Sequence, residues 1–104
     1  MPVNTHLVLP ELIGARDSAV ALANTLPPEL HGLEVTVDAS QLRSASEGFA
    51  DELVRQVIGV RDAASLAVGE STRRFAEHLR TSAARRGFEH RLVIDCREMA
   101  YSAS

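Results

Sequence analysis

The sequence predicts a single α/β domain whose sheet has about four, mostly parallel strands, with helices mainly on one face. Strand-like and helical segments follow one another over roughly residues 6–96 of the 104-residue chain, and no linker or repeat divides them. The strands also alternate apolar and polar side chains, whereas a parallel sheet covered on both faces has nearly continuous apolar runs. In the second strand, Leu33, Val35 and Val37 point to one face and Glu34, Thr36 and Asp38 to the other. In the last strand, Leu92, Ile94 and Cys96 point to one face and Arg91, Val93 and Asp95 to the other. We therefore expect the second sheet face to be open to solvent or to a partner.

Four strands are expected, at residues 6–9, 33–38, 65–68 and 90–96. Pro10 cannot donate to a sheet ladder and is expected to end the first strand. Gly69 is expected to end the third. The segments before residue 6 and after residue 100 are expected to be an extended lead-in and a loose tail.

Three helices are expected, at residues 15–26, about 46–58 and 72–86, because apolar residues recur there at helical spacing. These residues are Ala19, Leu22, Ala23 and Leu26, then Phe49, Ala50, Leu53, Val54, Val57 and Ile58, then Phe75, Ala76, Leu79 and Ala83. Pro27 and Pro28 stop the first helix. Gly59 is expected as the C-cap of the second helix, and Gly87 as the stop of the third. Leu12 to Arg16 is expected to open the first helix.

Composition and charge narrow the class of protein. The net charge of −3 argues against a dedicated nucleic-acid binder. The eleven basic residues are all arginine, nine of them after residue 54, and this composition is typical of a GC-rich bacterial genome or its phage. The single cysteine, Cys96, forms no internal disulfide, and neither a signal peptide nor a long apolar run is present. We therefore expect a cytoplasmic protein.

The segment from Glu34 to Val54 is the most informative part of the chain. An alternating strand ends at Asp38, a serine-rich turn follows, and a helix then begins near Ser46. Free N–H groups and the helix dipole suit such a turn to an anion or to a partner's carboxylate. The expected partner-binding or switch residues are Asp38, Ser40, Ser44, Ser46, Glu47, Gly48 and Asp51.

The chain resembles the STAS-like domains, a small bacterial group of undefined function related to the anti-sigma-factor antagonist STAS domains. The resemblance lies in Leu12-Ile13-Gly14-Ala15-Arg16, in Val37-Asp38 at a strand end, and in Phe49-Ala50-Asp51-Glu52-Leu53. It implies a non-enzymatic signalling regulator. Classical members bind a histidine-kinase-like ATPase, and phosphorylation of a serine at the start of the helix breaks the complex.

The chain departs from the STAS pattern at the switch itself. When Asp38 and Phe49 are aligned with the family, the phosphorylated serine falls near Glu47, and the serine just before the phenylalanine falls on Gly48. Ser44 and Ser46 are the nearest hydroxyls. Either Glu47 mimics a phosphate permanently, or the switch is absent.

Simpler structural roles are available for several of these residues. Ser46 is a good helix N-cap, and Asp38 can hydrogen-bond the turn that follows it. Asp51 is expected on the polar side of its helix, in a solvated ion pair with Arg55 four residues on.

Alternative functions use other residues. Arginines of the third helix, with Arg73 expected to pair with Glu77, are candidate nucleic-acid contacts: Arg73, Arg74, Arg80 and Arg85. The histidines and Cys96 have no metal-ligand spacing, and no phosphate-binding loop or nucleophile motif is present. We therefore expect no catalytic residue, no metal and no cofactor. The partner is expected to be a protein such as a kinase-like ATPase or a transcription regulator, with no membrane contact and nucleic acid as the second choice. Self-association through the open sheet face and an enzyme subunit completed by a second chain are further alternatives.

Overall fold

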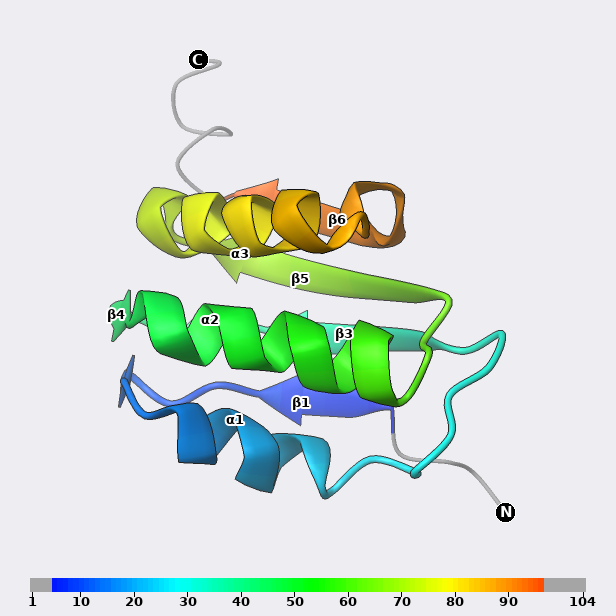
Figure 1. Cartoon of the computed structure of the whole chain (residues 1–104). Coiled ribbons are helices and arrows are strands. Elements are labelled where there is room, and N and C mark those ends of the chain that lie inside the picture. Colours follow the sequence, from blue (N-terminus) through cyan, green and yellow to red (C-terminus); the bar gives the residue numbers. More distant parts are fainter. Residues whose placement is uncertain (1–4, 97–104) are drawn as a thin grey trace.

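The computed structural model describes residues 5–96, and within this range the chain forms a two-layer α/β domain (Figure 1). One layer is a sheet of four strands, β1 (His6–Val8), β3 (Glu34–Asp38), β5 (Ser65–Ser71) and β6 (Leu92–Cys96). Their order is β1-β3-β5-β6, and every neighbouring pair is parallel. The other layer holds α1 (Arg16–Ala23), α2 (Glu47–Val54) and α3 (Arg73–Arg86). The predicted α/β class, the parallel sheet and the one-sided helix layer are confirmed.

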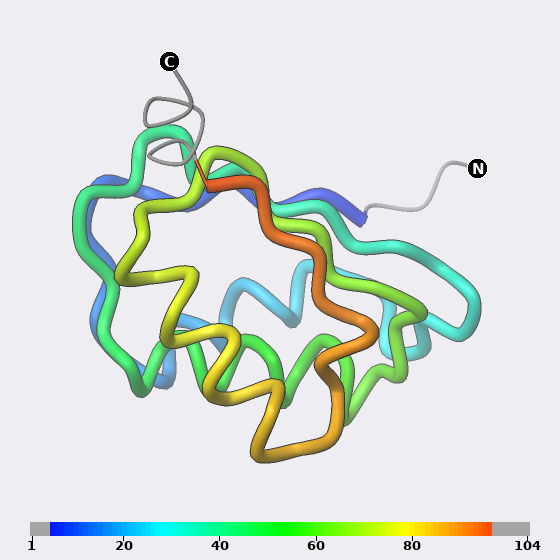
Figure 2. Tube along the Cα trace, turned by 90° about the horizontal axis from the view of Figure 1, so that it is seen from above, coloured from blue at the N-terminus to red at the C-terminus, as the bar shows by residue number. Residues whose placement is uncertain are grey.

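The core lies between the two layers, whose arrangement Figure 2 shows from above. Alternate residues of the central strands point into it, among them Val35 and Val37 of β3 and Leu66 and Val68 of β5. The middle helix, α2, packs against both α1 and α3, and its Phe49 ring stacks on Phe75 of α3 with centroids 6.1 Å apart. Each fully buried ring contributes about 1.5–3 kcal/mol. This packing fixes where the first turn of α2 stands relative to its neighbours.

Two short strands were not expected. Leu12–Ile13 forms β2, which pairs in parallel with β4 (Ser44–Ala45). Leu12 therefore belongs to a small separate ladder rather than to the start of the first helix, which begins at Arg16. The partner strand lies more than thirty residues away in sequence, so no local pattern could reveal it.

Several expected boundaries were wrong. The α-helix of α2 passes into a π-helical turn over Arg55–Val60, so Gly59 lies inside a helix and is not a C-cap. A β-carbon at Gly59 would lie 3.7 Å from the Phe88 ring, which shows that this turn packs closely against Phe88. Strand β5 continues past Gly69 to Ser71 through a bulge, and β6 begins at Leu92 because Glu89–Arg91 forms a 3₁₀ turn.

Other expected ends were nearly correct. Strand β1 ends at Val8, two residues before Pro10, and α1 ends at Ala23, ahead of the two prolines. Gly87 stops α3 as predicted, with a φ of 75° that favours glycine over other residues. Within residues 5–96, no helix is long and apolar enough to cross a membrane.

Candidate functional site

The turn after β3 is held rigidly by its own backbone and side chains. Oδ1 of Asp38 accepts a hydrogen bond from the backbone N–H of Ser40 at 2.9 Å. Hydrogen bonds from the side chain and backbone of Ser40 hold the pKa of Asp38 below its usual range. Asp38 thus has the turn-forming role expected of it, and its carboxylate stays ionised at the carboxyl end of the sheet.

Ser46 ties the turn to the segment before α1. Its hydroxyl accepts from the N–H of Phe49 at 3.0 Å, which is the helix N-cap bond, and donates to the carbonyl of Gly14 at 2.6 Å. The backbone N–H groups of Arg43 and Ser46 donate to the carbonyls of Glu11 and Ile13. The predicted N-cap is confirmed, and the same hydroxyl joins two segments that are 32 residues apart.

The exposed side chains of this region form one surface. Leu42 and Ala45 are buried and anchor the turn, while Gln41, Arg43, Ser44 and Glu47 face solvent. Beside them Leu12 is 69% exposed, a large apolar side chain that the paired strand β2 places next to Ser44. Leu12 was not among the expected site residues, because its position depends on the β2–β4 pairing. We call Leu12, Arg43, Ser44 and Glu47 the knuckle surface.

Asp51 does not belong to the knuckle surface. Its side chain is only 12% exposed and accepts hydrogen bonds from Arg16 of α1 at 3.0 Å and from Ser82 and Arg86 of α3 at 2.7 and 3.1 Å. Burial alone would raise the pKa of Asp51, but these hydrogen bonds outweigh it and lower the pKa to about 2. The expected solvated pair between Asp51 and Arg55 was wrong, because α1 and α3 flank α2 and cover this side of it.

Glu52 completes the same network. It is the partner of Arg55, at 2.8 Å, and it also accepts from Gln56 at 2.7 Å and from Arg16 at 3.3 Å. The hydrogen bond from Gln56 and the nearby arginines outweigh burial and hold the pKa of Glu52 below its usual range. Two buried carboxylates thus connect α1, α2 and α3, and their geometry is that of a clamp between helices rather than of a partner-facing patch.

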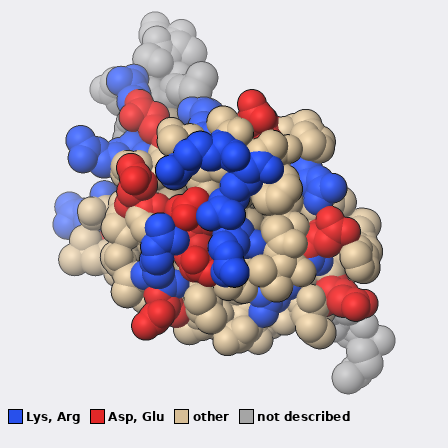
Figure 3. Space-filling view, viewed as in Figure 1, with Lys and Arg blue, Asp and Glu red and all other residues tan. Residues whose placement is uncertain are grey.

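The arginines of α3 divide into two groups. Arg73, Arg74 and Arg80 are exposed, whereas Arg85 lies 4.0 Å from Asp51 and Arg86 is hydrogen-bonded to it. Figure 3, viewed from the helix side, shows arginine side chains gathered around a few carboxylates. The buried carboxylates therefore neutralise part of this surface, since Arg85 and Arg86 both lie within 4.0 Å of Asp51.

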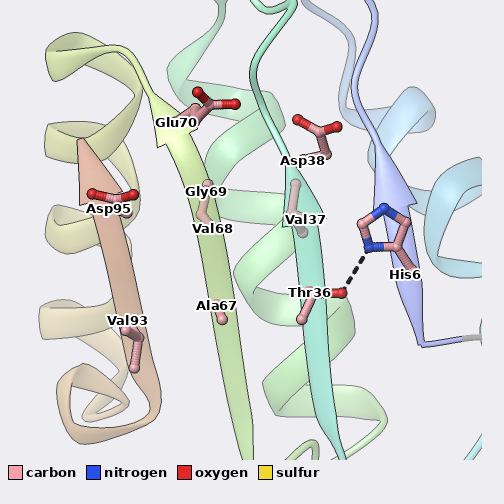
Figure 4. Close-up of a pocket in the computed structure, with 10 residues that line it drawn as sticks. All are labelled: His6, Thr36, Val37, Asp38, Ala67, Val68, Gly69, Glu70, Val93 and Asp95. Atoms are coloured by element: carbon pink, nitrogen blue, oxygen red, sulfur yellow. Dashed lines mark hydrogen bonds between the residues drawn. The ribbon is translucent and has the colours of Figure 1, made fainter. Parts of the chain in front are cut away.

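The open face of the sheet carries a second candidate site (Figure 4), an open hollow of about 430 Å³. Its floor is low because Ala67 and Gly69 of β5 present almost no side chain. Three carboxylates stand at its upper end in the view of Figure 4, from Asp38, Glu70 and Asp95. Only Asp38 was among the expected site residues. The small residues at alternate positions of β5 were the signal in the sequence for a hollow.

The histidines form no common site. His6 is hydrogen-bonded to Thr36 at 2.7 Å, and His31 lies 2.7 Å from Asp62, which also pairs with Arg91. Over residues 5–96, no group of three or more His, Cys, Asp or Glu side chains is arranged to hold a metal ion. Cys96 is buried at the end of β6, as its place in the alternation predicted.

Comparisons of the chain with models of protein families, with curated proteins and with solved structures find no match.

Proposed function

We propose that the protein is a non-enzymatic regulator of the STAS-like kind, which binds another protein through the segment 38–48 and the first turn of α2. The observation that carries the proposal is the ordered, exposed knuckle surface. Its backbone is fixed by the β2–β4 pairing and by the two hydrogen bonds of Ser46. A surface that is already ordered loses little conformational entropy on binding.

The chemistry of the knuckle surface is that of a protein contact. Leu12 offers an exposed apolar side chain, and charges of both signs stand next to it, since Glu11, the residue before it, pairs with Arg43 at 3.2 Å. Glu47 adds a carboxylate at the start of α2, 4.0 Å from His78 of α3. An apolar contact ringed by polar groups is the usual arrangement of a binding hot spot. The partner class that the STAS resemblance implies is a histidine-kinase-like ATPase.

The two candidate switch serines have different surroundings. Ser44 is exposed, and its hydroxyl makes no hydrogen bond within residues 5–96, so a phosphate there would change the charge of the knuckle surface without breaking such a bond. Ser46 uses its hydroxyl for both the helix cap and the bond to Gly14. If this protein is switched by phosphorylation, Ser44 is the residue that we expect to carry it, while Glu47 supplies a fixed negative charge.

The test is affinity capture with tagged wild-type protein and one matched pair of variants. Leu12→Ser removes the apolar centre of the knuckle surface, and Val60→Ser removes a similarly exposed apolar side chain, 55% exposed, on the π-helical turn. Capture of a stoichiometric protein that Leu12→Ser loses and Val60→Ser keeps supports the proposal. Equal capture by both variants overturns it.

Nucleic-acid association through α3 remains the second candidate, because Arg73, Arg74 and Arg80 are exposed on one helix. Replacing all three with Glu should abolish binding to single-stranded or duplex oligonucleotides, and wild-type binding should weaken steeply with salt. Retained binding by the triple variant would exclude this helix as the contact.

A further inference from the structure

We propose that the open face of the sheet is a docking surface for a basic amphipathic helix of another protein. This surface goes beyond the proposed function, because it lies on the face opposite the helix layer and needs neither Leu12 nor Ser44. Asp38 alone lies both in the segment 38–48 and at the hollow.

Within residues 5–96, no helix covers this face of the sheet. Parallel sheets occur almost only with both faces covered, but here α1, α2 and α3 all lie on the same side (Figures 1 and 2). Two β-branched apolar side chains remain on the open face, Val8 at 50% exposed and Val93 at 57% exposed. Covering them removes apolar surface from water, which favours a partner.

The open face is hollowed along β5. The strand register aligns His6, Thr36, Ala67 and Val93 in one row across the face. The side chain at the β5 position is small, while Val93 stands on the neighbouring strand β6, so the face is hollowed along β5 (Figure 4). A β-carbon at Gly69 would meet only the carbonyl of Val37, at 3.8 Å. The floor therefore has room for apolar side chains from outside.

The charged side chains around the hollow are acidic. The hollow is rimmed by the carboxylates of Asp38, Glu70 and Asp95, and none of the described residues that line it is an arginine. Glu70 adopts a φ of 54° beside the bulge of β5, and its side chain stands with the other two at the same end of the hollow (Figure 4). Charge complementarity thus favours an occupant with cationic side chains flanking an apolar stripe.

The acidic rim also bears on the alternative occupant, a second copy of the chain. A symmetric pair joined through this face with its two-fold axis along the strands would bring the same carboxylates against each other, which is unfavourable at neutral pH. A head-to-tail contact, which sets the hollow of one copy against a different surface of the next, avoids this repulsion. We commit to a helix of another protein, and the experiment separates the two cases.

The probe is a synthetic 18-residue amidated peptide with an Ala/Leu stripe flanked by Lys and Arg, labelled for fluorescence anisotropy. A scrambled peptide of the same composition controls for nonspecific attraction. We expect saturable binding of the amphipathic peptide to the full chain, at least about tenfold tighter than that of the scrambled peptide. Chemical-shift changes in an NMR titration should centre on Ala67, Gly69 and Val93.

Two kinds of variant then locate the contact. The rim variant, Glu70→Lys with Asp95→Lys, reverses the charge of two of the three rim carboxylates. The control variant, Asp17→Lys with Glu29→Lys, makes the same change of net charge at exposed acidic residues elsewhere. The rim variant should bind about tenfold more weakly or worse, and the control variant much less so. Gly69→Leu fills the hollow without changing charge and should also abolish binding.

Other outcomes overturn the proposal. Equal weakening by the rim variant and the control variant would show attraction to net charge alone, and so would equal affinity for the two peptides. Concentration-dependent self-association of the wild type in sedimentation, lost in the Gly69→Leu variant, would assign the face to a second copy. Unchanged peptide binding by Gly69→Leu would place the contact elsewhere. None of these results depends on the Leu12→Ser capture experiment, so the two proposals fail independently.

Discussion

The side chain of Arg16 crosses over Gly48 to reach Asp51. A β-carbon at Gly48 would lie 3.4 Å from Cγ and 3.5 Å from Nε of Arg16, and Nη1 of Arg16 is 3.0 Å from Oδ2 of Asp51. The STAS domains that the sequence resembles have a serine at the position of Gly48. The glycine here leaves the path open for an arginine that joins α1 to the buried carboxylates of α2.

The first prediction concerns Gly48. Gly48→Ala should change the free energy of unfolding by no more than about 1 kcal/mol, because a better helix former offsets a close contact with a flexible side chain. Gly48→Val should destabilise by about 1–2 kcal/mol more, since its branched side chain displaces Arg16. Urea unfolding of these variants in the wild-type and Arg16→Ala backgrounds checks this. An equal cost of Val in both backgrounds would contradict it.

The second prediction concerns the acid stability that Asp51 provides. Its pKa is about 2 in the folded protein, below the ordinary value of 3.8, so its stabilisation is fully present above pH 4 and is lost as the pH falls toward 2. The ionised Asp51 carboxylate contributes about 1–2 kcal/mol to the free energy of unfolding, less than the full pKa shift would give, because solvent screens its partly exposed arginine partners. Asp51→Asn should lower the free energy of unfolding at pH 7 and should make that free energy depend less on pH between pH 4 and 2. Asp17→Asn makes the same substitution at an exposed side chain and is the matched control, and an equal change of slope in both variants would contradict the prediction.

The third prediction compares two matched helix caps. Ser46 and Thr72 both accept a hydrogen bond from a phenylalanine N–H at the start of a helix, at 3.0 and 3.2 Å. Thr72→Ala should cost about 1 kcal/mol, the usual value of a cap. Ser46→Ala should cost about 0.5–1.5 kcal/mol more, because its hydroxyl also donates to Gly14. If thermal or urea unfolding shows that the two variants lose the same free energy of unfolding, the hydrogen bond from Ser46 to Gly14 contributes nothing to stability.

The fourth prediction is that a negative charge at Ser44 affects partner binding but not the stability of the fold. Ser44→Asp places a charge on an exposed side chain, so the free energy of unfolding should stay within about 0.5 kcal/mol of wild type. The same change should weaken capture of the partner, if the knuckle surface is the contact. Thr81→Asp adds the same charge on the exposed side of α3 and serves as the control. Equal capture by both variants would contradict a role for Ser44.

The sequence by itself determined the features that depend on near neighbours. Alternation in β3 and β6 determined that one sheet face is open, the helical spacing of apolar residues determined which faces of the helices are buried, and Gly87 and Ser46 marked a helix end and a helix start. These signals are local because a strand repeats every two residues and a helix every 3.6. The boundary at Gly59 failed because packing against Phe88 overrides the local preference of glycine to end a helix.

Only the tertiary structure decided how the candidate sites are made. From the sequence, Arg55 is the natural partner of Asp51, four residues on, yet the actual partners Arg16 and Arg86 are each 35 residues away. Leu12 is exposed beside Ser44 because β2 pairs with β4, and the hollow exists because the register sets Ala67 beside Thr36 and Val93. Such contacts depend on which strands and helices are neighbours in space. They stabilise the fold only once the intervening chain has been brought together, which costs conformational entropy.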